Sequence, residues 1–253
     1  MSTLATAFLV FLCCSGTALA GVMLHRKLPV HHLDGDSKDV VKLVMGLIAT
    51  MAALVLGLLI ASAKSSYDTQ ETELQQVATT IVQLDRMLEL YGADAREARG
   101  SLRSAVTAAL ERVWPAHADG AVNLAPSATR YEANTLYSQV QSLSPTTEGQ
   151  RHAQSAALEL GASLGQMRVL MFEQLGRPVQ WPLLVVLVFW VSVLFLGFGL
   201  LARFNVTVAV ALTLGALSVA SAIFMMLELS DPYGGLMRIS DAPLRAALAQ
   251  MGG

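Results

Sequence analysis

Four long stretches of the chain contain no Asp, Glu, Lys, Arg or His, and this feature limits the possible folds more than any other. They cover residues 4–24, 43–63, 181–202 and 206–227. A helix needs about 20 apolar residues to cross the roughly 30 Å hydrocarbon core of a bilayer. Composition agrees, because 54% of the residues are hydrophobic and 14% are charged, whereas soluble domains carry about 25% charged residues. The sequence therefore predicts an integral membrane protein with four transmembrane helices.

The first stretch also has a feature of a secretory signal, since the tripeptide ALA at residues 18–20 resembles a cleavage site. No Lys or Arg precedes the stretch, however, and the basic pair Arg26 and Lys27 follows it. That order of charges favours an uncleaved anchor whose N-terminus lies outside the cytoplasm. We expect the first helix to be retained, with cleavage as the alternative.

Residues 64–180 differ in composition from the four stretches, with 10 basic and 13 acidic side chains. Apolar residues recur there at spacings of three and four, which place them on one face of a helix. The first such seam consists of Leu74, Val77, Ile81, Leu84, Leu88 and Tyr91. Gly92, the next residue, is expected to end this helix. Asp94 and Glu97 have the spacing of a capping box at the start of a second helix, and two more helices are expected before residue 176. The fold class is therefore all-α, with a helical soluble domain inserted between the second and third spans.

No Pro or Gly separates the second span from the first soluble helix. One continuous helix is therefore expected from Asp39 to Tyr91, about 80 Å long at 1.5 Å per residue. The expected organisation is two spans in 1–63, the helical domain in 64–180, two spans in 181–227, and a turn with a short helix in 228–253.

Small residues recur at helical spacing on two of the spans, and such faces let helix backbones approach closely. Those on the second span are Gly46, Thr50, Ala53, Gly57 and Ala61, and those on the fourth are Thr207, Ala211, Gly215, Ser218 and Ala222. Packing within one subunit is the simpler interpretation, and a subunit interface or a pore lining is the more specific one. The lack of ionisable residues within the spans argues against a proton relay or an ion-coupled transporter.

Two polar segments lie beside the spans. His31, His32 and Asp34 are of types that bind divalent ions, but their spacing matches no known ligand pattern, so neither a metal nor another cofactor is predicted. After the fourth span, Glu228 and Asp231 are candidates for the mouth of a cation path. The alternative is that they belong only to a rigid turn at the end of the span.

Other classes of function have little support in the sequence. The net charge of −2 disfavours a nucleic-acid partner. No Walker, Rossmann, HExxH, GxSxG or CxxC pattern is present, so no enzymatic activity is predicted. The adjacent Cys13 and Cys14 lie within the first apolar stretch and suit neither a disulfide framework nor a metal site.

Three segments resemble the bacterial bestrophin-like integral membrane proteins, a family of unknown function. They are GDSKDVVKLVMGLIATMAALVLGLLIASAKSSYD at 35–68, ELQQVATTIVQLDRMLELYG at 73–92 and SDPYGG at 230–235. The likeness covers nearly the whole chain, as two spans, a helical domain and two spans. True bestrophins are more distant: they are oligomeric anion channels with a bulky apolar neck and an acidic calcium clasp, neither of which can be placed on this sequence. Channel function is thus implied by the resemblance and not by the residue spacing.

Our leading hypothesis is a homo-oligomeric, channel-like, multi-pass protein of the bacterial inner membrane, with an ion as its possible cargo. The alternative is a non-conducting scaffold or sensor whose helical domain binds another protein. Basic residues near the span ends predict the orientation. Arg26, Lys27, Lys38, Lys42 and Arg203 lie on one side, and Lys64 and Arg177 are the nearest on the other. The short loops are therefore expected in the cytoplasm, with both termini and residues 64–180 outside it.

Overall fold

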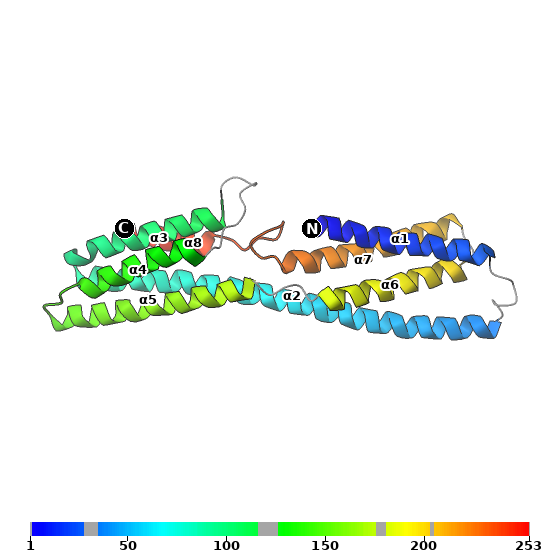
Figure 1. The fold of residues 1–253 in the computed structure, drawn as a ribbon, viewed down its shortest axis with the longest axis horizontal. Coiled ribbons are helices and arrows are strands. Elements are labelled where there is room, and N and C mark those ends of the chain that lie inside the picture. Colours follow the sequence, from blue (N-terminus) through cyan, green and yellow to red (C-terminus); the bar gives the residue numbers. More distant parts are fainter. Residues whose placement is uncertain (1, 28–34, 116–125, 176–180, 203–204, 253) are drawn as a thin grey trace. The chain divides into compact units, whose positions relative to one another are not determined.

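The protein is described by a computed structural model, which covers residues 2–27, 35–115, 126–175, 181–202 and 205–252. All regular elements in these ranges are helices, which confirms the all-α prediction (Figure 1). They are α1 (Thr3–Lys27), α2 (Gly35–Tyr91), the 3-10 helix η2 (Ala93–Ala95), α3 (Arg96–Val113), α4 (Pro126–Ser142), α5 (Glu148–Leu175), α6 (Trp181–Leu201), α7 (Val206–Leu229) and α8 (Ala242–Gln250).

Four of these helices, α1, α2, α6 and α7, are long and apolar enough to cross a membrane. They correspond to the four uncharged stretches of the sequence, of which only Ala202 lies outside its helix. The expectation of one continuous helix beyond the second span is also confirmed, since α2 runs without interruption for 57 residues. It ends at Tyr91, and the next residue, Gly92, has a φ of 109°, which glycine adopts without strain.

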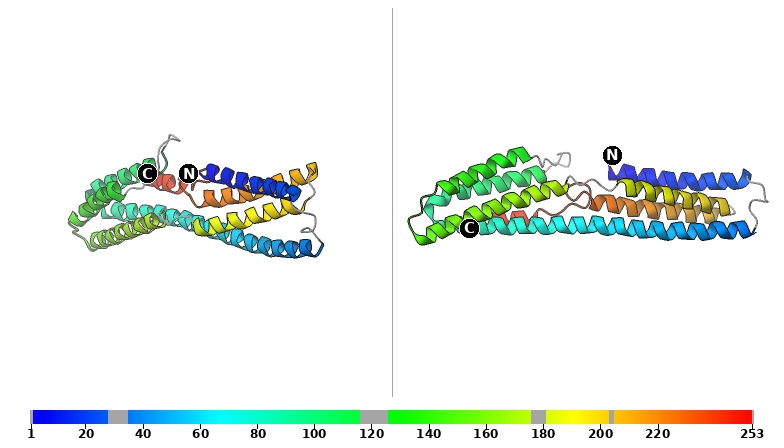
Figure 2. Two further views of the ribbon diagram at one scale, coloured as in Figure 1. Left: turned by 45° about the vertical axis from the view of Figure 1, so that its right-hand side comes forward. Right: turned by 60° about the horizontal axis from the view of Figure 1, so that its bottom comes forward.

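Contacts within the chain divide it into two compact units. The membrane unit comprises Met1–Tyr67 and Pro178–Asp231, and the bundle unit comprises Asp68–Arg177 and Pro232–Gly253. In the membrane unit, α1 packs along both α6 and α7 (Figures 1 and 2). Buried residues from all four of its helices form one core: Val10, Cys14, Ala18, Ala52, Leu59, Ala63, Leu184, Leu187, Val191, Phe195, Ala216, Ile223, Met226, Leu227 and Leu229.

Two glycines bring α1 and α6 into backbone contact. A Cβ added at Gly21 would lie 2.1 Å from the carbonyl oxygen of Leu196, and one added at Gly199 would lie 2.1 Å from that of Ala18. Cys14 is fully buried on the same helix. Cys13 is exposed, and its Sγ lies 3.3 Å from Ser192 Oγ. Small residues at this crossing thus allow the backbones of α1 and α6 to approach each other closely.

The predicted seam on α2 supplies much of the core of the bundle unit. Leu74, Ile81, Leu84, Leu88 and Tyr91 are buried, while Val77 is half-buried. They pack in a unit that also buries Ala98, Leu102, Val106 and Leu110 of α3, Val140 of α4, and Ala153 and Ala157 of α5.

An ion pair between Arg99 and Asp85 is partly buried within this bundle. Arg99 donates from Nε and from a terminal nitrogen to the two oxygens of Asp85, each at 2.8 Å. The hydrogen bond to Asp85 raises the pKa of the Arg99 guanidinium above its ordinary value. Because the Asp85 side chain is only 8% exposed, the bidentate geometry compensates a carboxylate that has lost most of its water. The pair joins α2 to α3.

The helix caps differ from the expectation. Asp94 and Glu97 form no capping box, because α3 begins at Arg96 with Ala95 at its N-cap and no side-chain cap bond. Asp94 instead lies in η2, and the Glu97 carboxylate accepts a hydrogen bond from Gln139 Nε2 at 3.1 Å. The physical reason is the 3-10 turn, which moves the N-cap of α3 one residue past the predicted cap, from Asp94 to Ala95.

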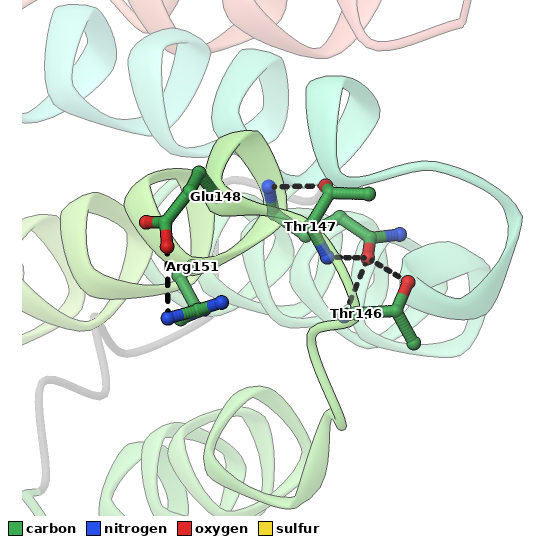
Figure 3. A network of polar contacts seen from close by, with 5 residues as sticks. Thr146, Thr147, Glu148 and Arg151 are labelled. Atoms are coloured by element: carbon green, nitrogen blue, oxygen red, sulfur yellow. Dashed lines mark hydrogen bonds and ion pairs between the residues drawn. The ribbon is translucent and has the colours of Figure 1, made fainter.

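A capping box does form at the start of α5 (Figure 3). Gln150 N donates to Thr147 Oγ1 at 3.1 Å, and Thr147 N donates back to Gln150 Oε1 at 3.3 Å. Glu148 and Arg151 add an ion pair of 2.9 Å on the same turn. Gln150 Nε2 also donates to the carbonyl of Tyr91 at 3.1 Å, so this cap ties the first turn of α5 to the end of α2.

Candidate functional site

The small-residue stripe on α2 is open. Gly46, Thr50, Ala53, Gly57 and Ala61, which we call the open stripe, are all exposed in the subunit. A Cβ added at either glycine would meet nothing within 4 Å. The membrane unit buries a different face of α2, roughly 130° around the helix at about 100° per residue. That face consists of Met45, Ala52, Leu59 and Ala63. The open stripe therefore does not pack against the parts of the subunit that the structure describes.

Large apolar side chains flank the open stripe. Leu47, Leu54 and Leu58 are each more than half exposed. The Thr50 hydroxyl donates to the carbonyl of Leu47 at 2.8 Å, so the one hydroxyl of the stripe has its proton bonded within the helix. Soluble monomers rarely expose contiguous apolar surface of this kind. It suits lipid, a second subunit, or a narrow apolar passage.

The stripe on α7 is used differently. Thr207, Ala211 and Ser218 are exposed, whereas Gly215 and Ala222 are half-buried. A Cβ at Gly215 would lie 3.4 Å from the ring of Phe195 in α6. The α7 stripe is thus partly occupied by packing within the subunit, and the structure does not bring it together with the open stripe as one surface.

Glu228, a predicted mouth residue, is buried and only 2% exposed. Thr3 at the start of α1 donates its hydroxyl proton to Glu228 Oε1 at 2.5 Å. The bond places the first turn of α1 beside the last turn of α7. Asp231, the second mouth candidate, is exposed, and its backbone N donates to the Glu228 carbonyl at 3.1 Å. Of the two carboxylates, only that of Asp231 lies at the surface of the subunit.

A short loop after α7, residues 232–239, is anchored in the bundle unit. Ile239 N donates to the Pro232 carbonyl at 2.8 Å and closes the base of the loop. Trp114 Nε1 of α3 donates to the Ile239 carbonyl at 2.9 Å, and its ring meets Tyr233 edge-on at 5.8 Å. Burial, with a smaller contribution from the nearby Glu73, raises the pKa of Tyr233 above its ordinary value. The sequence had indicated a turn here, but not its attachment to Trp114.

The weak metal candidates His31, His32 and Asp34 lie outside the described residues. Within the ranges that the structure describes, no group of three His, Cys, Asp or Glu side chains is placed to hold a metal ion. The neighbouring His25 has its Nδ1 2.7 Å from the carbonyl of Leu200, which links α1 to the end of α6.

A family model for the bestrophin-like domain matches residues 12–244. The chain belongs to the bestrophin-like family. The three segments that carried the resemblance all fall within the matched range, so the recognition from sequence is confirmed. The search of curated proteins gave no match.

Solved structures similar to this bestrophin-like chain include two point variants of a bacterial bestrophin homologue from Klebsiella pneumoniae. One is 13% identical with a TM-score of 0.68 and 97% of each chain covered. The other is 13% identical with a TM-score of 0.66, covering 98% of this chain and 100% of its own. A variant described only as a membrane protein is 12% identical, with a TM-score of 0.67 and 97% of both chains covered. At these identities the likeness shows the fold.

The family match, the shared fold and the four long apolar helices identify this bestrophin-like chain as a membrane protein. The likeness assigns no role to a particular side chain. The open stripe, the buried Glu228 and the anchored 232–239 loop are properties of this chain, read from its own contacts.

Proposed function

We propose that this protein is a homo-oligomeric channel of the bacterial inner membrane, in which the open stripes of several subunits meet around a central path. One observation carries the proposal: Gly46, Thr50, Ala53, Gly57 and Ala61 form a row of small residues that is exposed among the residues the structure describes. Family membership and the fold shared with bacterial bestrophin homologues support it.

In this proposal the bundle units form a vestibule around the path. Small residues at an axis leave room for a passage without burying charge. The passage is mostly apolar, and such constrictions close by dewetting. The resting channel is therefore closed, and conduction requires widening of the path.

The test compares two neighbouring substitutions that have the same chemistry. Ala53→Asn places an amide on the open stripe and eases wetting of the path. Leu54→Asn places the same amide one residue on, at a leucine that is 75% exposed beside the stripe. In liposomes loaded with an ion-sensitive dye, Ala53→Asn is expected to raise flux well above that of the parent protein. Leu54→Asn is expected to leave it near the parent level.

Each other result counts against the channel. Flux at the level of empty vesicles for Ala53→Asn, with the oligomer intact, favours the non-conducting scaffold or sensor. Equal leak from both variants assigns the effect to disturbed packing and not to a path along the stripe. Mass photometry in mild detergent, together with crosslinking in membranes, provides the control for assembly. Only single subunits in both measurements would contradict the oligomer.

A further inference from the structure

The 232–239 loop carries two adjacent, exposed apolar side chains at its tip. Leu236 is 78% exposed and Met237 is 40% exposed. Arg238, which follows them, is also exposed. By contrast, Tyr233 and Ile239 on either side of the tip are buried, at 4% and 2% exposed. The base of the loop is therefore buried in the bundle unit, and the side chains at its tip are exposed.

The tip is held by a defined scaffold. Gly235 has a φ of 62°, which permits the reversal of the chain. Its carbonyl accepts a hydrogen bond from Arg238 Nε at 3.2 Å. Below the tip, the bond from Ile239 N to the Pro232 carbonyl and the bond from Trp114 Nε1 fix the base. Leu236 and Met237 are thus displayed from a closed, anchored turn.

The position of this loop in the chain limits what can cover the tip. The membrane helix α7 ends at Leu229, and the chain from there to Leu236 can extend at most about 25 Å. Backbone bonds at Ser230 and Asp231 shorten that reach, since they continue the last turn of α7. Apolar tip residues beside an arginine match the interface of a bilayer, where side chains enter the acyl boundary and a cation meets the phosphates.

We infer that Leu236 and Met237 insert into the lipid interface next to the end of α7, with Arg238 at the headgroups. The occupant is a phospholipid surface. The tip is a contact with the membrane in addition to the four spanning helices, and it requires neither conduction nor oligomerisation.

Depth-dependent fluorescence quenching of the whole protein in liposomes tests this inference. Leu236→Cys is labelled with an environment-sensitive dye, after a check that the parent protein, whose Cys13 and Cys14 lie in α1, takes up little of it. The matched control is Leu90→Cys. That leucine is 68% exposed and lies about 40 Å along α2 from Ala63, at 1.5 Å per residue.

The expected result is that brominated phospholipid quenches the dye at position 236, aqueous iodide does not, and position 90 shows the reverse. Quenching of position 236 by iodide alone would overturn the inference. Protection from both quenchers would also overturn it, because the tip would then lie against a second copy of the chain. Equal elution volume and helical circular dichroism of the labelled and parent proteins establish that the fold is retained.

Discussion

Gly21 of α1 lies against the backbone of Leu196 in α6, so closely that an added Cβ would be 2.1 Å from the carbonyl oxygen. A backbone carbonyl cannot rotate away as a flexible side chain can. The contact therefore fixes the closest approach of α1 and α6, the helix pair whose core includes Cys14 and Leu187.

Gly21→Ala is expected to destabilise the membrane unit by about 1–3 kcal/mol, the usual range for an overpacked contact. Gly16→Ala is the matched control on the same helix, since a Cβ there meets nothing within 4 Å. The thermal midpoint of unfolding in mild detergent should fall for the first variant. It should stay level or rise slightly for the second, because Ala is the better helix former. Equal midpoints would contradict the close crossing.

Thr3→Val is expected to weaken the attachment of α1 to the end of α7. The variant removes the proton donated to Glu228, and the loss of a hydrogen bond to a buried acid costs about 1–3 kcal/mol. Thr213→Val in α7 is the control, because that hydroxyl donates only to the carbonyl of Ala209 at 2.9 Å and the residue is exposed. Unfolding in detergent should separate the two variants. Hydrogen exchange should rise in the first turn of α1 for Thr3→Val alone.

The protein is expected to become less stable at high pH because of the buried Tyr233 phenol. Its folded-state pKa is raised, whereas an unfolded tyrosine has a pKa of about 10. Below pH 10 both states are neutral, but above it the unfolded chain ionises first, so the free energy of unfolding declines as pH rises. Tyr233→Phe should remove this part of the decline.

At neutral pH, Tyr233→Phe should leave stability unchanged or increase it by up to about 1 kcal/mol, because the buried hydroxyl has no hydrogen-bond partner among the described residues. Tyr137→Phe is the control, since Tyr137 is 47% exposed. Denaturant unfolding at pH 7 and pH 11 provides the comparison. A clear loss of stability for Tyr233→Phe at pH 7 would show that the hydroxyl makes a bond in solution.

The orientation predicted from the basic residues is tested with paired reporters. Alkaline phosphatase, active only outside the cytoplasm, should give signal when fused after Gly253. A green fluorescent protein at the same position should stay dark. The opposite pattern would place the short loops outside the cytoplasm and the C-terminus inside it.

The membrane helices could be predicted because a single property determines them. An uncharged run of about 20 residues has few stable places other than a bilayer, so the stretch at 181–202 corresponds closely to α6 (Trp181–Leu201). The buried seam from Leu74 to Tyr91 could be predicted equally well, because spacings of three and four place residues on one face of a single helix.

The use of the small residues could not be predicted in the same way. Periodicity shows that Gly46 and Gly57 share a face, but not what that face meets, and the structure leaves it open. The tight crossing of α1 and α6 uses Gly21 and Gly199, which lie on two helices that the sequence does not identify as neighbours. Its geometry depends on which helices become neighbours, and that is a property of the whole unit. The Thr3–Glu228 bond joins opposite ends of the chain and has no local signal for the same reason.

The continuity of α2 has a practical consequence for dissecting the molecule. This one helix supplies Ala52 and Leu59 to the core of the membrane unit, and Leu84 and Leu88 to the core of the bundle unit. Each unit is also completed by a segment from later in the chain. A single cut therefore releases neither unit whole. A separately expressed bundle would have to begin within α2 near Asp68, and a linker would have to replace α6 and α7 so that Pro232–Gly253 stays attached.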